Sequence, residues 1–344
     1  MYLLPVDLES NFHSRYLPPD LLFEGLHSFA ALEVIGSSVQ QRPIYAARLG
    51  TGATKILAWS QMHGNESTTT RALIDFFTRV REDRTILETF RFILIFQLNP
   101  DGAYAYTRHN ANHVDLNRDA LDQTQPETQA FMRVLNEFSP DLCLNLHDQR
   151  TRFSVGETGH EAALSFLAPA ADEQRSHTDS RLRSMALIGA VVKRFPHAVQ
   201  LKIARFNDAF NVNCFGDYLA QLGVPTILIE AGQWGTDYDR VITRRLVFES
   251  LVSMVREWPY LSVNDLNLTQ YFEVLENTEY AYDEGGVDPN DGQLKGFRYK
   301  ERLEAGQIHY DLDEHHVISS ENRYKVCFRS TYTVRDKENK NATG

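Results

Sequence analysis

Two patterns of hydrophobic and polar positions alternate along the chain. Continuous apolar runs rich in β-branched residues predict buried strands, whereas apolar positions three or four apart predict helices that bury one face. We expect strands at residues 31–36, 44–49, 54–60, 91–98, 141–146, 163–167 and 225–229, and helices at 21–29, 71–81, 126–138, 173–195, 217–222 and 237–258. Strands that alternate with helices in this way predict an α/β sandwich.

After residue 258 the pattern changes to short β-leaning runs between polar turns. Residues 271–275 and 324–328 are such runs, and residues 288–292 form a turn signal of Asp, Pro, Asn and Gly. We therefore predict a large domain at residues 1–258 and a small β-rich C-terminal module at residues 259–344.

The composition is that of a globular protein, with 42% hydrophobic and 24% charged residues. At 344 residues the chain is long enough to bury a large core. Its formal net charge of −11 argues against nucleic acid or an anionic membrane as the main partner. The three cysteines lie far apart, which indicates reduced thiols, and the first residues lack the basic and apolar segments of a signal peptide. We therefore expect a cytoplasmic protein that crosses no membrane.

Residues that can bind a metal stand where predicted strands end. His63 and Glu66 follow one strand, His147 ends another 84 residues later, and Glu230 ends a third. Each alone has a simpler explanation: a surface pair, a hydrogen-bonded structural histidine or a salt-bridged core glutamate. Together they predict a convergence in the crevice at the carboxyl edge of a sheet. Two imidazoles and one carboxylate in a short-then-long spacing suit zinc and leave one position for water.

Further motifs occur in a fixed order between residues 45 and 258. The ordered set is His63-x-x-Glu66, Asn99-Pro100-Asp101-Gly102, Arg108, Val114-Asp115-Leu116-Asn117-Arg118, His147 and Ile229-Glu230-Ala231-Gly232. Each piece is common, but the ordered combination is specific. It resembles the zinc metallocarboxypeptidase family, in its carboxypeptidase A-like, compact bacterial-type branch. The resemblance implies a catalytic domain with a mixed central sheet flanked by helices.

The resemblance implies that His63, Glu66 and His147 hold one zinc ion (Zn²⁺) per chain. Two neutral imidazoles and one carboxylate leave the ion with a net positive charge, which lowers the pKa of bound water towards ~7. The family pattern also makes Asp115 the acceptor for the ring N–H of His63.

The same resemblance assigns the residues that act on a substrate. Glu230 matches the general base that takes a proton from the zinc-activated water and later passes one to the leaving amine. Arg108 matches the arginine that polarises the scissile carbonyl. Asn117 and Arg118 match the pair that holds the terminal carboxylate, for which a guanidinium offers a planar fork. The implied activity is hydrolysis of the C-terminal amide bond of peptides.

Two regions depart from the family pattern. The mobile tyrosine that pancreatic-type enzymes carry before the catalytic glutamate has no match, because Phe210 and Asn211 occupy that region. The specificity-pocket segment at residues 213–217 has no alignable motif. The preferred C-terminal residue therefore stays open, and a charged pocket would need Asp217 or Arg205.

Two other functions fit the same residues. One is a deacylase of N-acyl amino acids similar to aspartoacylase and succinylglutamate desuccinylase, which share H-x-x-E and carry a C-terminal β module; the intact motif at residues 99–102 favours the peptidase. The other is a non-catalytic, zinc-holding binding module, against which Glu230 and Arg108 argue. Either enzyme would take a peptide or N-acyl amino acid with a free carboxylate. The C-terminal module is expected to pack beside the cleft and to restrict it to small or flexible substrates.

Overall fold

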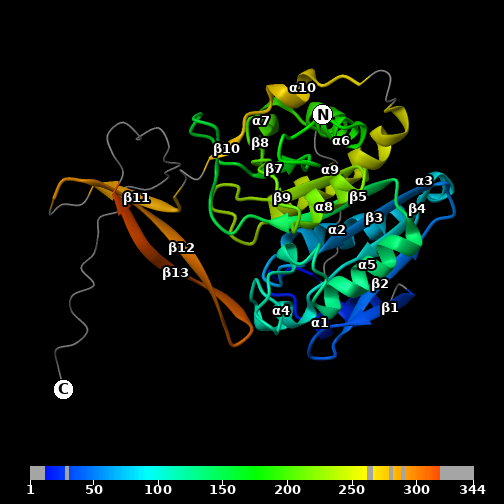
Figure 1. Ribbon diagram of the computed structural model, residues 1–344. Coiled ribbons are helices and arrows are strands. Elements are labelled where there is room, and N and C mark those ends of the chain that lie inside the picture. The colour runs from blue at the N-terminus through cyan, green and yellow to red at the C-terminus, as the bar shows by residue number, and fades with distance from the viewer. Residues whose placement is uncertain (1–11, 28–30, 262–265, 279–281, 288–290, 318–344) are drawn as a thin grey trace.

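A mixed eight-stranded β-sheet forms the centre of the molecule (Figure 1). The computed structural model describes residues 12–27, 31–261, 266–278, 282–287 and 291–317. In sheet order the strands are β1 (Leu32–Ser37), β2 (Pro43–Leu49), β4 (Phe90–Ile95), β3 (Thr54–Ser60), β5 (Leu142–Asp148), β9 (Thr226–Ala231), β7 (Leu164–Leu167) and β8 (Ile203–Arg205). Strands β4, β3, β5 and β9 run parallel, whereas β2 and β7 run antiparallel to β4 and β9. The predicted mixed α/β fold is confirmed.

Helices cover both faces of this sheet. One face carries α2 (Thr68–Val80), α6 (Asp179–Arg194) and α9 (Val241–Glu257), and the other carries α5 (Pro126–Phe138) and α8 (Phe215–Gln221). Successive residues of β3 point to opposite faces, so Ala58 joins the core under α2 and α9, and Trp59 joins the core under α5 and α8. The shorter helical elements are α1 (Pro19–His27), α3 (Arg84–Thr89), α4 (Pro100–Ala105), α7 (His197–Gln200), α10 (Thr269–Glu273) and the 3₁₀ turns η1 (Leu116–Arg118) and η2 (Trp258–Tyr260). In the described part of the chain, no helix combines the length and apolarity that crossing a membrane requires.

Helix α2 begins earlier than the sequence predicts, at Thr68 instead of Arg71. The carboxylate of Asp148, at the end of β5, accepts hydrogen bonds from the backbone N–H groups of Thr68 (2.8 Å) and Thr69 (3.0 Å). A carboxylate at a helix N-terminus accepts hydrogen bonds from the free backbone N–H groups and interacts favourably with the positive end of the helix dipole. The cap therefore comes from a distant strand and not from the serine and threonines that precede the helix.

Two further segments differ from their predicted form. The turn expected at residues 99–102 opens the short helix α4, because the side chain of Asn99 accepts the N–H of Gly102 at 2.8 Å. The prediction of a β-leaning run at residues 271–275 is wrong, since this segment lies largely in α10. Tyr271 is buried there against α6, where Gly189 leaves room for the Tyr271 backbone.

The described part of the C-terminal region is rich in β-structure, as predicted. After α10, β10 (Asn277–Thr278) pairs with β6 (Ser154–Val155) of the large domain. Strands β11 (Glu284–Val287), β12 (Leu294–Glu304) and β13 (Gln307–Val317) then form a separate antiparallel sheet, whose long β12–β13 hairpin is the orange element of Figure 1. The run expected at residues 324–328 lies outside the described residues, and the domain boundary at residue 258 stays a prediction.

Candidate metal and catalytic site

Three buried side chains converge at the carboxyl ends of β3 and β5. His63 Nδ1 lies 2.9 Å from Glu66 Oε1, and His147 Nδ1 lies 2.9 Å from Glu66 Oε2. The two Nδ1 atoms are 3.2 Å apart, and ligand atoms of all three residues lie within 4.8 Å of one another. The structure thus brings together the three residues that the sequence predicts as metal ligands.

Close backbone packing fixes the loop that carries His63 and Glu66. A Cβ atom at Gly64 would lie 1.9 Å from the carbonyl carbon of Gly102, so the two backbones meet at a distance that only glycine allows. Asn99 joins the same contact, since its Nδ2 donates to the carbonyl of Met62 at 3.2 Å. The motif at residues 99–102 therefore supports the ligand loop from behind.

Asp115 sets the orientation of the first histidine. Its Oδ1 lies 2.9 Å from His63 Nε2, as the sequence predicts, which places the ring proton on Nε2 and the lone pair of Nδ1 towards the cluster. Burial raises the pKa of the Glu66 carboxyl, but His63 and His147 outweigh burial and hold this pKa well below its ordinary value. Nitrogen lone pairs facing one ionised carboxylate form a donor set that suits a divalent cation.

Arg108 lies beside this cluster. Its Nε and Nη2 donate to Asp115 Oδ2 at 3.0 and 2.9 Å, and its Nη1 lies 3.5 Å from Glu66 Oε1. The side chain is 39% exposed, so the guanidinium faces solvent on its remaining side. In this position the positive charge of the Arg108 guanidinium can interact with negative charge that develops next to the ligand residues.

Asn117 and Arg118 lie on the α5 and α8 side of the ligands. The Asn117 Oδ1 accepts the backbone N–H of Phe215 at 3.0 Å, which ties η1 to the start of α8. Arg118 is exposed, and its Nη1 donates to the carbonyl of Asn117 at 2.6 Å and lies 3.0 Å from Cys214 Sγ. The guanidinium therefore stands at the rim of the site, accessible from solvent.

Glu230 is the neighbour of His147 across two parallel strands. The two residues are paired in the register of β5 and β9, so both side chains stand at the same edge of the sheet. Within the described chain, no hydrogen bond is formed by the Glu230 carboxylate. Burial raises the pKa of this carboxyl well above its ordinary value, and the carboxylates of Glu66 and Asp148 raise it further.

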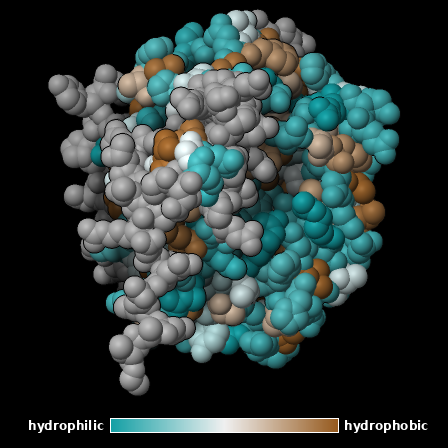
Figure 2. Space-filling view, turned by 90° about the vertical axis from the view of Figure 1, so that its left-hand side faces the viewer, coloured by the Kyte–Doolittle hydropathy of each residue, from teal (hydrophilic) through white to brown (hydrophobic). Residues whose placement is uncertain are grey.

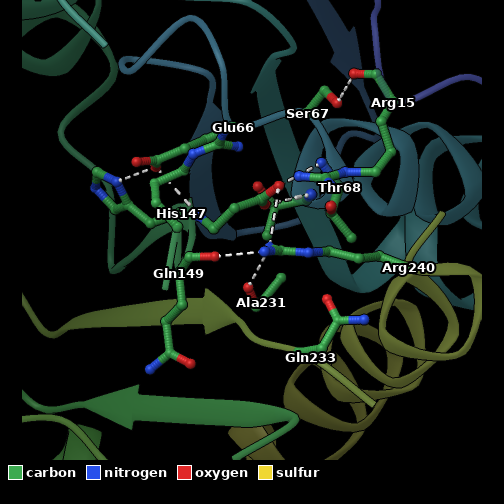
Figure 3. A network of polar contacts seen from close by, with 12 residues as sticks. Arg15, Glu66, Ser67, Thr68, His147, Gln149, Ala231, Gln233 and Arg240 are labelled. Atoms are coloured by element: carbon green, nitrogen blue, oxygen red, sulfur yellow. Dashed lines mark hydrogen bonds and ion pairs between the residues drawn. The ribbon is translucent and has the colours of Figure 1, made fainter. Parts of the chain in front are cut away.

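Arg240 holds the ends of these two strands together, a role that the sequence did not reveal (Figure 3). Its Nη1 donates to the carbonyl of Ala231 at 2.9 Å and its Nη2 to the carbonyl of Gln149 at 2.6 Å. Those carbonyls follow Glu230 by one residue and His147 by two. The sequence could not reveal this role, because the two hydrogen-bond acceptors are backbone carbonyls, which carry no sequence signal.

The candidate pocket residues lie in two different places. Asp217, in the first turn of α8, accepts the backbone N–H of Asn211 at 2.7 Å, and burial raises its pKa to about 6. Arg205 instead donates to the carbonyl of Val274 at 2.7 Å, beside α10. Its guanidinium also lies over the ring of Tyr271, and these contacts explain its position without a ligand.

Comparisons with known proteins agree with this geometry. A family model described as zinc carboxypeptidase matches residues 26–191, a range that contains the three ligand residues, Arg108, Asn117 and Arg118 and ends before Glu230. Carboxypeptidase 2 of Trichophyton rubrum is 26% identical over 100 residues, which cover 27% of this chain and 19% of that protein. Human carboxypeptidase D is 28% identical over 174 residues, which cover 40% of this chain and 12% of that protein. The chain thus matches a fifth or less of the length of these two relatives.

Solved structures share the fold. A metallo-carboxypeptidase from Burkholderia cenocepacia superposes with a TM-score of 0.54 at 14% identity, covering 73% of this chain and 71% of that one. Thrombin activatable fibrinolysis inhibitor gives a TM-score of 0.59 at 14% identity, covering 75% and 77%. The family-model match and the His-Glu-His cluster inside it identify residues 26–191 as a zinc carboxypeptidase domain.

Proposed function

We propose that this protein is a zinc-dependent metallocarboxypeptidase that hydrolyses the C-terminal amide bond of peptides. The observation that carries the proposal is the convergence of His63, Glu66 and His147, with Glu230 beside His147 in the strand register. Arg108 lies next to the same ligands and Arg118 stands at the rim. This combination supplies a metal site, a base and two cations for anionic parts of a substrate.

The ligand residues fit one zinc ion per chain. The Nδ1 atoms of both histidines and the Glu66 carboxylate face one another, and Asp115 holds the His63 tautomer that leaves Nδ1 unprotonated. When bound, zinc supplies Lewis acidity that lowers the pKa of water and polarises a carbonyl. Glu230 then acts as the general base that accepts the water's proton and returns one to the leaving amine.

The two arginines have different tasks. Arg108 provides positive charge where the oxyanion of the attacked carbonyl develops, since its Nη1 already lies 3.5 Å from Glu66 Oε1. Arg118, with the amide of Asn117, binds the free carboxylate at the end of the substrate through charge-assisted hydrogen bonds. This anchor sets the distance from the chain end to the metal, so that only the last amide bond reaches the base.

Substituting Arg118 with alanine is expected to abolish most of the preference for a free C-terminus. In the wild type, an amidated peptide loses one charge and leaves Arg118 poorly paired, so it is a poor substrate. The variant should raise KM for the free-acid peptide, and misplacement should also lower kcat. The measurement is kcat/KM for a free-acid peptide and its amide with both proteins.

Lysine at position 118 serves as the matched variant, because it keeps the charge but lacks the planar fork. It should retain part of the preference. Equal cleavage of the acid and the amide by the wild type would show that Arg118 does not anchor the chain end.

The comparisons favour neither alternative function, and the residues give a way to test both. A deacylase would prefer an N-acyl amino acid to a tripeptide with the same C-terminal residue, whereas a binding module would hydrolyse neither.

The widely spaced cysteines remain the basis for proposing a cytoplasmic location.

A further inference from the structure

The β12–β13 hairpin carries a buried carboxylate into the large domain. The Glu301 side chain, on β12, is only 8% exposed. Its Oε1 lies 2.5 Å from Arg15 Nη1, its Oε2 accepts the hydroxyl of Tyr106 at 2.5 Å, and it forms an ion pair with Arg150. Burial opposes ionisation, but Arg15 and Arg150 hold the pKa of the Glu301 carboxyl well below its ordinary value. The carboxylate therefore stays charged in its pocket.

Other contacts fix the same hairpin in place. Arg152 Nε donates to Asp283 Oδ1 at 2.6 Å, just before β11. The ring of Tyr238 packs against Tyr299 (5.4 Å between centroids) and Tyr310 (5.0 Å), and the Tyr310 hydroxyl donates to the carbonyl of Tyr238 at 3.1 Å. Figure 2 views the molecule from this side, and the surface that is not grey there is mainly hydrophilic.

Glu301 is one side chain away from the metal-ligand loop. Arg150, its partner, follows His147 by three residues, and its Nη1 donates to the carbonyl of Asn65 at 2.6 Å. Asn65 directly precedes the ligand Glu66. The hairpin thus reaches the edge of the catalytic site instead of packing at a distance from it.

This edge is opposite the one that carries Arg118. Arg118 contacts Cys214, the residue before α8, and follows Leu116, which lies in the core under α5 and α8. Arg15 contacts Ser67, at the start of α2, and Arg240 directly precedes α9, on the other face of the sheet. The metal-ligand residues lie between these two sides, at the ends of the central strands.

We propose that the hairpin, held by Glu301, closes the cleft on the amino side of the scissile bond and limits the enzyme to short substrates. The proposal rests on the function proposed above, because Arg118 defines the carboxyl side. Arg150 contacts both the carbonyl of Asn65, beside the ligand Glu66, and the carboxylate of Glu301, so a substrate chain that leaves the metal cluster towards Asn65 meets the Arg150–Glu301 pair. The substrates that fit are short peptides and N-acyl amino acids, which share one amide followed by a residue with a free carboxylate.

The test is a length series with one C-terminal residue: an N-acetyl amino acid, an N-acetyl dipeptide and an N-acetyl hexapeptide. For the wild type, kcat/KM is expected to be at least about tenfold higher for the better short substrate than for the hexapeptide, which equals about 1.4 kcal/mol. Glu301→Gln removes the charge that holds the hairpin and should reduce this ratio to about threefold or less. The two short substrates also distinguish a peptidase from a deacylase.

Glu304→Gln is the matched control on the same hairpin. Glu304 pairs with Arg302 at 2.6 Å, but its side chain is 60% exposed, so this variant should keep the wild-type ratio. Tyr310→Phe, which keeps Glu301 and removes the hydroxyl that contacts Arg15 and Tyr238, is a milder second variant and should give an intermediate ratio. Zinc content of each variant establishes that the metal site is intact.

Each outcome decides one question. Equal wild-type rates for all lengths would refute the closure and leave the carboxypeptidase proposal standing. A wild type that discriminates by length, together with Glu301→Gln and Tyr310→Phe proteins that discriminate equally, would refute the role of Glu301. Failure of the zinc-loaded wild type on every substrate would instead refute the proposed function.

Discussion

Replacing Glu230 with glutamine is expected to lower kcat by about 10²- to 10⁴-fold, the usual contribution of a general base. The amide has the shape of the carboxylate but cannot accept a proton from water. Because no described residue forms a hydrogen bond with the Glu230 carboxylate, the substitution breaks none there, and it replaces a group whose charged form is disfavoured by burial. Zinc content and thermal unfolding should therefore match the wild type or show a more stable protein.

Glu137→Gln is the control for this experiment. Glu137 is an exposed residue of α5, and the same chemical change there should leave kcat unaltered. The measurement is steady-state hydrolysis of a free-acid peptide by the three zinc-loaded proteins. A Glu230→Gln enzyme with wild-type kcat would make Glu230 a structural residue and remove the base from the mechanism.

Substituting His147 with alanine is expected to empty the metal site. His147 Nδ1 faces both Glu66 and His63, and without it only two ligand residues remain. Removal of a group that merely orients a ligand costs about 10- to 100-fold in metal affinity, so loss of a ligand should exceed this. Metal analysis after dialysis should show little zinc, and hydrolysis should fall in parallel.

The exposed His160 supplies the matched control, since His160→Ala removes the same ring from the surface. That variant should keep the zinc content and activity of the wild type. Full retention of zinc by the His147→Ala protein would mean that the ion is held elsewhere.

The ligand residues could be predicted because strand ends leave a local signal. Each apolar run stops at a polar residue, and parallel strands bring such residues to one edge. His63, His147 and Glu230 are all found in this way, and the structure places them where the strand pattern indicates. The family resemblance added the loop residue Asp115, whose contact with His63 is present.

Long-range contacts explain what the sequence did not reveal. Asp148, which caps α2, lies 80 residues after Thr68 and 79 residues after Thr69 in the sequence. The threonines before Arg71 therefore predicted the wrong helix start. Glu301 reaches Arg15 across 286 residues, and neither residue has a distinctive neighbourhood in the sequence. At residues 271–275, burial of Tyr271 against α6 overrides a weak local strand preference.

The most direct test of the central claim is mass analysis of the products formed from one short free-acid peptide. Zinc-loaded protein should release a single amino acid from the carboxyl end, chelation should stop this release, and added zinc should restore it. Cleavage at an internal bond or at the amino end, or release that continues unchanged after the metal is removed, would contradict the assignment of a zinc-dependent carboxypeptidase.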